Sequence, residues 1–536
     1  MERWGKHPTA ESYRKEWLKK QYGDRFSEKM ICGIAQCFAD FLKLSTYRKP
    51  EYVTSELYSI DNYNEAWRVL ELCGSIIERA DSYYTYFRDT DWEDVFYQTF
   101  YYQAVGTSNV TRMQIYKSLS DYYATAGCTL ANVYADLVDE CIAYDKSITY
   151  HYNNQMSNGK WHMMMSSPHG GFKTWNSDGW SYPMGSRIAP NEKAEMIVIA
   201  DGGCKELYFS NTERQVRCIT LGNSGVGRYE FTVRCDNDWI RITDKDGNDV
   251  SGGSVETAGY LYLSILWDKI MSNKIGSIAI ISGDTIERIF VTVKYIGLSD
   301  KGAGTHIEGC DGIILDAHQY ASSQRADNGT CWQEIKGYGR YESVMKMYPT
   351  TVSFANRTGN TYTVKSGNNV RTVSECNEPT DAPYLEYKIY VDRNAEYTFT
   401  AYTTPSNNIW KPHGLGYLPI ELFYGIRVDN GAIKTINSLP VGKYISFAAD
   451  SDNQWIKGIK NNIHISTSKE FMTKGIHRIR IYGMHSGLGL ERIIISSSEL
   501  KRSYLGPDKS YVTDFDATPE QKVIVHFEAG KDIVYV

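Results

Sequence analysis

Hydrophobic positions in the first third of the chain recur with the 3.6-residue period of an α-helix. The two clearest stripes consist of Met30, Ile31, Ile34, Phe38, Phe41 and Leu42, and of Ala66, Val69, Leu70, Cys73, Ile76, Ile77 and Ala80. Side chains at this spacing share one face of a helix, and that face is buried against other helices. Asn62, followed by Glu65, resembles the capping box that starts a helix. We therefore predict an antiparallel bundle of four or five helices.

The hydrophobic period changes to two from about residue 190 onward, which is the spacing of a β-strand with one buried face. In "YEFTVR", for example, Tyr229, Phe231 and Val233 share one face, and "YLYLSILW" and "IERIFVTVKY" alternate in the same way. The Gly283-Asp284 pair between two such runs predicts a hairpin turn. About 100 residues of this pattern are typical of a small immunoglobulin-like sandwich.

A further β-rich block follows the Gly-rich segment 297–306, and its length favours a larger sandwich of the carbohydrate-module type. The predicted fold class is thus multidomain α + β, with a helical bundle followed by two β-sandwiches. We place the helical bundle and its crossover segment at 1–188. The small sandwich is placed at 189–297 and the C-terminal sandwich at 307–536.

Composition and charge exclude several classes of function. The net charge of −6 without a large basic block argues against a nucleic-acid partner. No apolar run is long enough to span a bilayer, so we expect no membrane partner. The N-terminus lacks the apolar core of a signal peptide, which leaves localisation open. The 42 Tyr and 12 Trp suit both sugar stacking and core filling.

The stretch "GKWHMMMSSPHGGFKTW", residues 159–175, is the most unusual in the chain. His162 and His169 lack a third ligand at clear spacing, and no C-x-x-C occurs, so we expect no metal site and no cofactor. The large soft side chains of this stretch suit an uneven seam between domains. We predict that Trp161, Met164, His169 and Trp175 lie largely buried between the helical bundle and a β domain.

The same stretch resembles a signature segment of glycoside hydrolase family 115, the xylan α-1,2-glucuronidases. Gly159, Lys160, Trp161, Met164, Met165, His169, Gly171 and Trp175 match that segment in register. Ser167, Gly170 and Phe172 replace its usual Gln, Ile and Tyr, which removes an amide and a phenol. "CWQEIKGYGRYESVMKMYP", "PYLEYKIYV" and "GLGLERIII" are similar to later parts of the family, so the resemblance runs from about residue 9 to 505.

The resemblance implies a C-terminal portion of such an enzyme. Family members carry a (β/α)8 barrel with the catalytic acids ahead of the helical bundle, and no pattern of eight strand–helix units precedes Tyr58. No catalytic residue of the family is therefore carried over. The chain is expected to be an accessory part of a glucuronidase-like hydrolase, inactive alone, with glucuronoxylan or a related polysaccharide as partner. A separately encoded catalytic half or a second copy of the chain are further expected partners, and the family is typically exported.

Two other interpretations stay open. The chain would be a stand-alone carbohydrate-binding protein if Trp410, His413 and Tyr417, on the loop 403–419, stack on a sugar. In the simpler view Trp410 packs against a neighbouring domain. An active site at the seam near His162 and His169 is the second alternative, although a buried, hydrogen-bonded His169 is the plainer expectation. "GNSGVG", residues 222–227, lies between β runs and indicates a turn, not a phosphate loop.

Overall fold

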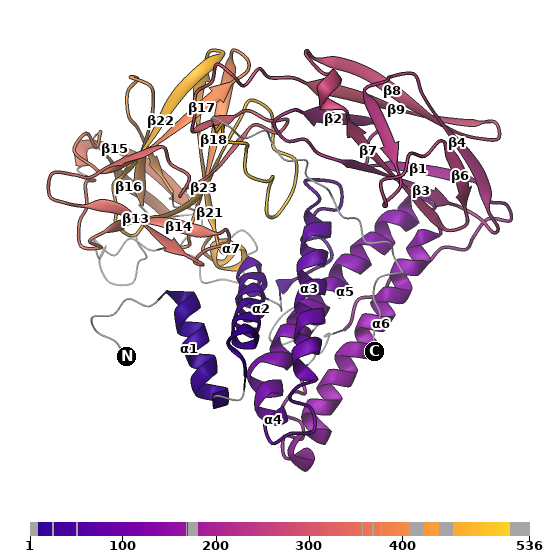
Figure 1. Cartoon of the computed structure of the whole chain (residues 1–536). Coiled ribbons are helices and arrows are strands. Elements are labelled where there is room, and N and C mark those ends of the chain that lie inside the picture. Colours follow the sequence, from indigo (N-terminus) through magenta and orange to yellow (C-terminus); the bar gives the residue numbers. More distant parts are fainter. Residues whose placement is uncertain are drawn as a thin grey trace.

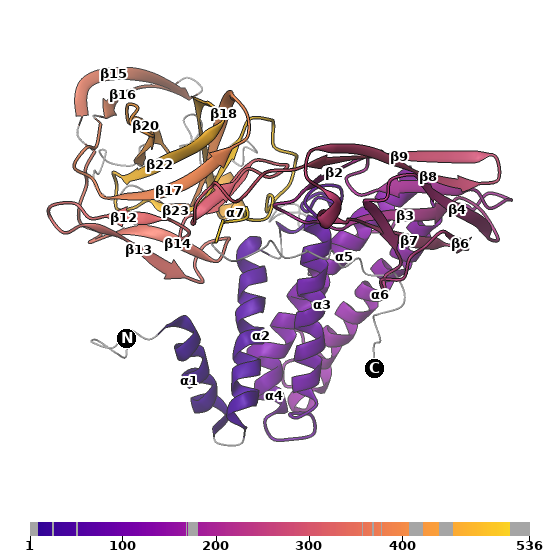
Figure 2. The same ribbon diagram turned by 45° about the horizontal axis from the view of Figure 1, so that its top comes forward.

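The computed structural model describes residues 9–23, 26–49, 52–167, 169, 181–355, 357–366, 369–376, 378–406, 422–438 and 454–514. Within these ranges a helical region forms the foot of the molecule, and two β-sandwiches lie side by side above it (Figure 1). The rotated view shows the same arrangement (Figure 2). A helical region followed by several β-sheets is the fold class that the sequence predicts, and that prediction is confirmed.

The helical region is built from long antiparallel helices. Its elements are α1 (Ala10–Tyr22), α2 (Glu28–Tyr47), α3 (Glu65–Tyr84), α4 (Glu93–Phe96), a π-helical turn (Tyr97–Tyr101), α5 (Tyr102–Thr125), α6 (Leu130–Tyr150), a second π-helical turn (His151–Gln155) and a 3₁₀ turn (Met156–Gly159). Thr9 and Ser27 cap the first two helices, because their hydroxyl oxygens accept the N–H groups of Ser12 and Met30 at 3.1 and 3.3 Å. Over the described ranges, none of these helices has the length and apolar content that a membrane span needs.

Tyrosines fill much of the core of the helical region. Its buried tyrosines are Tyr22, Tyr58, Tyr84, Tyr97, Tyr101, Tyr102, Tyr116, Tyr123, Tyr134 and Tyr152. Several of their hydroxyls find partners inside the bundle: that of Tyr97 donates to the carbonyl of Ile148 at 2.9 Å, and that of Tyr101 to Asp81 at 2.6 Å. A large share of the aromatic residues therefore serves packing, not sugar stacking.

The first sandwich pairs two sheets. Its strands are β1 (Met196–Ala200), β2 (Glu206–Ser210), β3 (Arg217–Asn223), β4 (Tyr229–Cys235), β5 (Ile240–Thr243), β6 (Gly252–Val255), β7 (Ala258–Ile265), β8 (Lys274–Ser282) and β9 (Thr285–Lys294), with a 3₁₀ turn at Trp267–Lys269. The sheet orders are β1-β3-β7-β5 and β2-β9-β8-β4-β6. Gly283 and Asp284 join β8 to β9, as predicted. Leu221, Leu263 and Val291 meet in the fully buried core. The immunoglobulin-like type stays a prediction.

The first sandwich rests on the turn between α5 and α6. The backbone N–H of Thr129 donates to the carbonyl of Asn223 at 2.8 Å. At Gly222 the strand passes so close to Cys128 that a Cβ would lie 2.3 Å from its sulfur. Glycine is therefore needed at the contact between this strand and the helical region.

The second sandwich also has two main sheets. Its elements are β10 (Thr305–Ile307), β11 (Ile313–Asp316), β12 (Ser322–Gln324), β13 (Cys331–Lys336), β14 (Ser343–Tyr348), β15 (Arg357–Ser366), β16 (Asn369–Cys376), β17 (Tyr384–Val391), β18 (Ala395–Thr403), β19 (Phe423–Val428), β20 (Lys434–Asn437), α7 (Gln454–Asn461), β21 (His464–Met472), β22 (Gly475–Gly483) and β23 (Gly489–Ser496). The orders are β10-β17-β22-β19-β20 and β13-β14-β23-β18-β21, with a separate β15-β16 hairpin. Strands of the two sandwiches are separated by residues 295–304, near the predicted linker, and the exact domain boundaries stay predictions.

Glu65, at the start of α3, joins the helical region to the segment that follows β23. Its carboxylate has no exposed surface and accepts the N–H groups of Ser59 at 2.7 Å, of Tyr504 at 2.8 and 3.0 Å, and of Leu505. Burial raises the pKa of Glu65, and these N–H groups oppose the rise. The predicted capping box is wrong in detail, because the N–H of Asn62 bonds the Ser59 hydroxyl instead.

We predict that Glu65→Ala lowers the free energy of unfolding by about 3 kcal/mol, because one buried and two partly buried backbone N–H groups lose their acceptor. Urea unfolding followed by circular dichroism measures the loss. Glu78→Ala, at an exposed position of the same helix, is the matched control and should change stability by less than about 0.5 kcal/mol. Equal effects of the two variants would contradict the linking role of Glu65.

Candidate functional site

The segment after α6 forms a tight loop held by Asn153. The side-chain amide of Asn153 accepts the N–H of Met165 at 2.8 Å and donates to its carbonyl at 3.1 Å. Ser157 and Asn158 have left-handed φ angles of 43° and 54°, so the chain reverses sharply at this point. The Met165 end of the loop is therefore fixed to the end of the bundle.

His169 closes a polar cluster on the bundle. Its Nδ1 lies 2.8 Å from the carboxylate of Asp145, and its Nε2 lies 3.0 Å from the hydroxyl of Tyr102. Asp145 is 1 % exposed and also accepts the hydroxyl of Tyr182 at 2.6 Å. His162 bonds a different residue: its Nδ1 lies 2.9 Å from the side-chain oxygen of Asn154. The two histidines thus have separate partners. His169 is hydrogen-bonded, as expected, but its side chain is 26 % exposed, so the expected burial is only partial.

The expected burial does not hold for Met164, which is 59 % exposed. The physical reason is the geometry of the loop. Met163 has a left-handed φ of 62°, and the Asn153 side chain bonds the backbone of Met165, so the loop turns Met164 to solvent. Trp161 is half-buried and packs on the core of the helical region, not on a β-sandwich, with the Lys160 ammonium 4.8 Å from its ring centre. The docking of a β domain by this segment stays a prediction.

Several predicted residues lie outside the described part of the chain. They are Gly171 and Trp175 of the docking segment, and Trp410, His413 and Tyr417 of the candidate sugar loop. The described chain resumes at residue 181 and runs along the bundle. There the N–H of Ile188 donates to the side chain of Asn132 at 2.9 Å, and Arg187 pairs with Asp136 at 2.5 Å. Polar contacts therefore hold the described part of the crossover.

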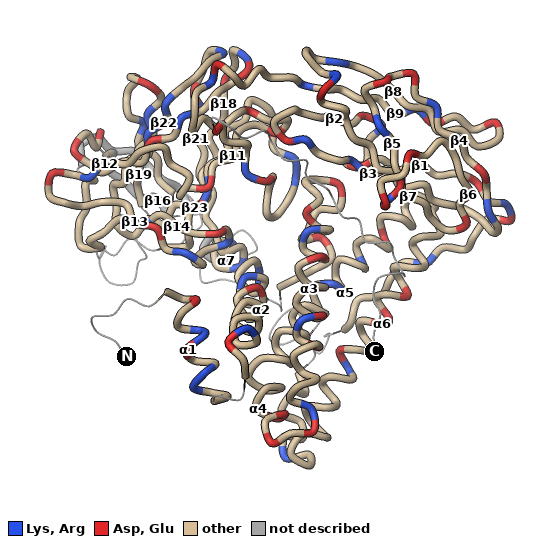
Figure 3. Tube along the Cα trace, in the orientation of Figure 1, with Lys and Arg blue, Asp and Glu red and all other residues tan. Residues whose placement is uncertain are grey.

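A cavity of about 1260 Å³ opens where the helical region and both sandwiches meet. Its charged lining consists of Asp61, Arg68, Glu71, Asp201, Glu206, Glu213, Arg217, Lys294, Asp311, Asp392, Arg393, Glu499, Lys501, Asp508 and Lys509. Ligand sites commonly occupy about 300–1,000 Å³, so this cavity has room for more than one sugar ring. Basic and acidic residues are also interspersed along all three parts of the chain (Figure 3).

Charges in the cavity are largely paired with one another. Arg68 of the helical region bonds Asp508 of the C-terminal part at 2.5 Å, and Arg217 bonds Asp201 within the first sandwich at 3.2 Å. Glu213 accepts the backbone N–H of Cys310 at 2.8 Å and so joins the two sandwiches. The lining carries nine acidic and six basic residues and is therefore polar and net acidic, with many groups able to hydrogen-bond hydroxyls.

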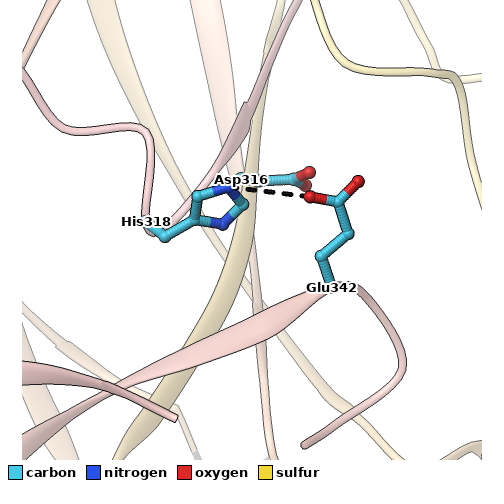
Figure 4. A group of neighbouring side chains, drawn as sticks. All are labelled: Asp316, His318 and Glu342. Carbon is cyan, nitrogen blue, oxygen red and sulfur yellow. Dashed lines mark ion pairs between the residues drawn. The ribbon is translucent and has the colours of Figure 1, made fainter. Parts of the chain in front are cut away.

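Asp316, His318 and Glu342 form a group of potential metal ligands in the second sandwich. Their ligand atoms lie within 4.8 Å of one another (Figure 4). His318 lies 3.7 Å from Glu342 and bonds the hydroxyl of Ser343 at 3.0 Å, whereas Asp316 receives the guanidinium of Arg492 at 2.6 Å. A hard cation or a protonated base would be stabilised between these carboxylates.

Sequence reasoning missed this group. The spacing of Asp316 and His318 was the available signal, because residues two apart at a strand end lie on one face. Glu342 lies in the turn before β14. It comes close to Asp316 and His318 because β11 and β14 both pair with β23. Nothing local in the sequence indicates that pairing.

A helical bundle joined to two β-sandwiches around a shared polar cavity defines a multidomain protein of mixed α and β class. The family model described as "Glycosyl hydrolase family 115 C-terminal domain" matches residues 305–509, which confirms the resemblance to family 115 over that part of the chain. No curated protein sequence matches the chain.

Three solved structures illustrate the similarity. A family 115 4-O-methyl-α-glucuronidase with specificity for decorated arabinogalactans matches at 10% identity and a TM-score of 0.46, over 91% of this chain and 42% of its own. The C-terminal CBM6 of LamC, from Zobellia galactanivorans, matches at 10% identity and a TM-score of 0.20, over 34% and 98%. A family 35 carbohydrate binding module from Clostridium thermocellum matches at 10% and 0.20, over 35% and 98%. The chain thus spans less than half the length of the family 115 structure.

We predict that His169→Ala lowers the free energy of unfolding by about 2 kcal/mol, because the buried Asp145 loses a hydrogen-bond partner. Met164→Ala, on the exposed part of the same segment, should stay within about 0.5 kcal/mol of the parent chain. Chemical unfolding of both variants gives the comparison. A large loss at Met164 would restore the view that this residue docks a β domain.

Proposed function

We propose that the chain is an accessory, C-terminal part of an α-glucuronidase-like glycoside hydrolase and has no hydrolase activity of its own. The match of residues 305–509 to the family 115 C-terminal domain carries this proposal. The substrate class that it implies is a polysaccharide decorated with glucuronic acid, either glucuronoxylan or an arabinogalactan. The catalytic machinery would be supplied by a separate barrel domain or chain.

The strand pairing of the described residues supports an accessory role. Among these strands, parallel pairing is confined to β2 with β9 and to β10 with β17. A (β/α)8 barrel needs eight parallel strands in a closed ring. The described part of the chain therefore contributes sandwiches and helices around the cavity, but no barrel.

Two of the acids that line the cavity form ion pairs with arginines, which supports the same conclusion for these two groups. A glycosidase needs two carboxyl groups across the scissile bond, one of them protonated and the other free to act as nucleophile or base. Asp201 and Asp508 are instead neutralised by Arg217 and Arg68. Both carboxylates are thus engaged in ion pairs within the protein.

We expect the purified chain to release no glucuronic acid and no 4-O-methylglucuronic acid from glucuronoxylan or from decorated arabinogalactan. Chromatography of the products after long incubation measures release, with an active α-glucuronidase as positive control on both polymers. Release above the buffer blank would overturn the accessory role. If release occurs and is unchanged in Asp201→Asn and Asp508→Asn, these two carboxylates are not the catalytic groups.

A stand-alone carbohydrate-binding protein is the second candidate function. Trp410, on a loop rich in Pro, Asn and Gly within the C-terminal β-rich part, is the sequence observation that favours it. Sugar binding there would depend on ring stacking, which alanine substitution removes.

Affinity electrophoresis in gels containing glucuronoxylan tests this function. Retardation of the parent chain, lost in Trp410→Ala, is the expected result if the loop binds sugar. Tyr338→Ala is the matched control, because Tyr338 is a 48 % exposed aromatic in the turn between β13 and β14 of the second sandwich. Unchanged mobility of the parent chain in every polysaccharide gel would rule this function out.

A further inference from the structure

The sheet β2-β9-β8-β4-β6 of the first sandwich has one face buried and one face in solvent. Its inner face carries alternate residues such as Ile278, Ile289 and Val291, which lie in the core of the sandwich. The other sheet of the sandwich contacts the turn between α5 and α6 through Asn223 of β3. The outer face of β8 and β9 therefore points away from the helical region (Figures 1 and 2).

Large apolar side chains are exposed on this outer face. Phe290 of β9 is 52 % exposed and Tyr208 of β2 is 45 % exposed, and Ile275 and Ile286 are exposed on the same face. The register of β2 and β9 places Tyr208 beside Thr292, two residues after Phe290, so the two rings lie on adjacent strands. Exposed rings on a flat sheet surface offer apolar faces on which sugar rings stack.

Two arginines lie in one row across the same face. Arg234 of β4 pairs with Ala279 of β8, and Ala279 pairs in turn with Arg288 of β9. Because neighbouring strands lie about 4.8 Å apart, the Cα atoms of the two arginines are roughly 10 Å apart. The small side chain of Ala279 leaves the space between them open. Two guanidinium groups can therefore close on a single anion above Ala279.

The positive charge of this row is not neutralised by neighbouring acids. Both arginines are exposed, and within the described structure neither guanidinium has an ion pair or a side-chain hydrogen bond. Glu230, four residues before Arg234, and Asp236, two residues after it, form no ion pair with it. Glu287, next to Arg288 in sequence, is paired with Lys205. The chemical complement of the row is therefore a carboxylate.

The outer face continues into the cavity between the three parts of the chain. Glu206, Tyr208 and Thr292 belong to this face and also line the cavity. Glu206 lies on β2, on the side of β9 away from β4, so it is on the cavity side of the arginine row. The net acidic cavity suits neutral hydroxyl groups, whereas the arginine row suits an anion. A long, mostly neutral polymer with scattered carboxylates matches both regions.

We propose that the outer face of β4, β8 and β9 binds a polysaccharide that carries uronic acid groups. Arg234 and Arg288 hold the uronate carboxylate, because a guanidinium matches the two oxygens of a carboxylate. Phe290 and Tyr208 stack on the neighbouring sugar rings. A second copy of the chain fits this face less well, since the unpaired arginines of both copies would meet in one contact. The choice of polymer rests on the proposed function, whereas the arrangement of arginines and rings does not.

The affinity of the whole chain for two polymers tests the proposal. One is glucuronoxylan, and the other is the same xylan after an active α-glucuronidase has removed its glucuronic acid. The parent chain should bind glucuronoxylan at least about tenfold more tightly. Arg234→Gln with Arg288→Gln should abolish this preference, whereas Phe290→Ala should weaken the binding of both polymers. Arg241→Gln is the matched control, because Arg241 is an exposed arginine on the other sheet, paired with Asp249, and should change neither affinity.

Several outcomes would overturn the proposal, and all variants named for this face are at exposed positions where the fold is retained. They are equal affinity for both polymers, no binding of either, and a preference that survives the double arginine variant. Binding that is lost in Trp410→Ala but kept in the double arginine variant would assign the sugar site to the loop 403–419 instead. A dimer in sedimentation velocity that Phe290→Ala dissociates would assign the face to a second copy of the chain.

Failure of this site and failure of the proposed function give different results. Release of glucuronic acid by the parent chain, measured separately, would overturn the accessory role and leave the comparison of affinities unchanged. Absence of a carboxylate-dependent affinity would overturn the binding site, while the chain would still release no product.

Discussion

Charged side chains that satisfy the backbone of a different part of the chain are the constraint on which this structure depends. Glu65 of the helical region accepts N–H groups of Tyr504 and Leu505, and Lys43 donates to carbonyl groups of the second sandwich. Within the C-terminal part, Arg340 donates to the carbonyl of Tyr504 at 2.6 Å and its guanidinium lies 3.9 Å from the centre of the Tyr504 ring, while the Tyr504 hydroxyl donates to the carbonyl of Tyr47 in the helical region. Because a buried charge without a partner is strongly destabilising, the Glu65 and Lys43 contacts each fix the relative position of two parts.

These contacts also define the cavity. Its walls come from the start of α3, from the edge of the first sandwich and from residues 498–511, none of which is close to the others in sequence. The segment 498–511 lines the cavity on one side and carries the backbone groups that Glu65 and Arg340 hold. The polar lining of the cavity and the rigidity of the junction therefore arise from the same stretch of chain.

The local elements could be predicted from the sequence because each has a clear hydrophobic period. Ile76 and Ile77 are buried in α3, and Val291 and Val293 are buried in β9, as their spacing requires. The contacts between parts could not be predicted, because they join residues hundreds of positions apart. Glu65 illustrates this limit. Its spacing from Asn62 predicts a local cap, yet its carboxylate accepts the backbone N–H of the distant Tyr504. Backbone N–H donors of distant segments, which compete for such a carboxylate, leave no mark on local periodicity.

The two ends of the second sandwich are bonded to each other. The N–H of Gly304 donates to the carbonyl of Thr513 at 2.7 Å, and the N–H of Thr513 donates to the carbonyl of Thr305 at 2.9 Å. A unit whose entry and exit points lie close together has the geometry that tolerates insertion into another chain. Residues 304 and 513 have that geometry, so the second sandwich closes on itself at the point where it meets the preceding segment.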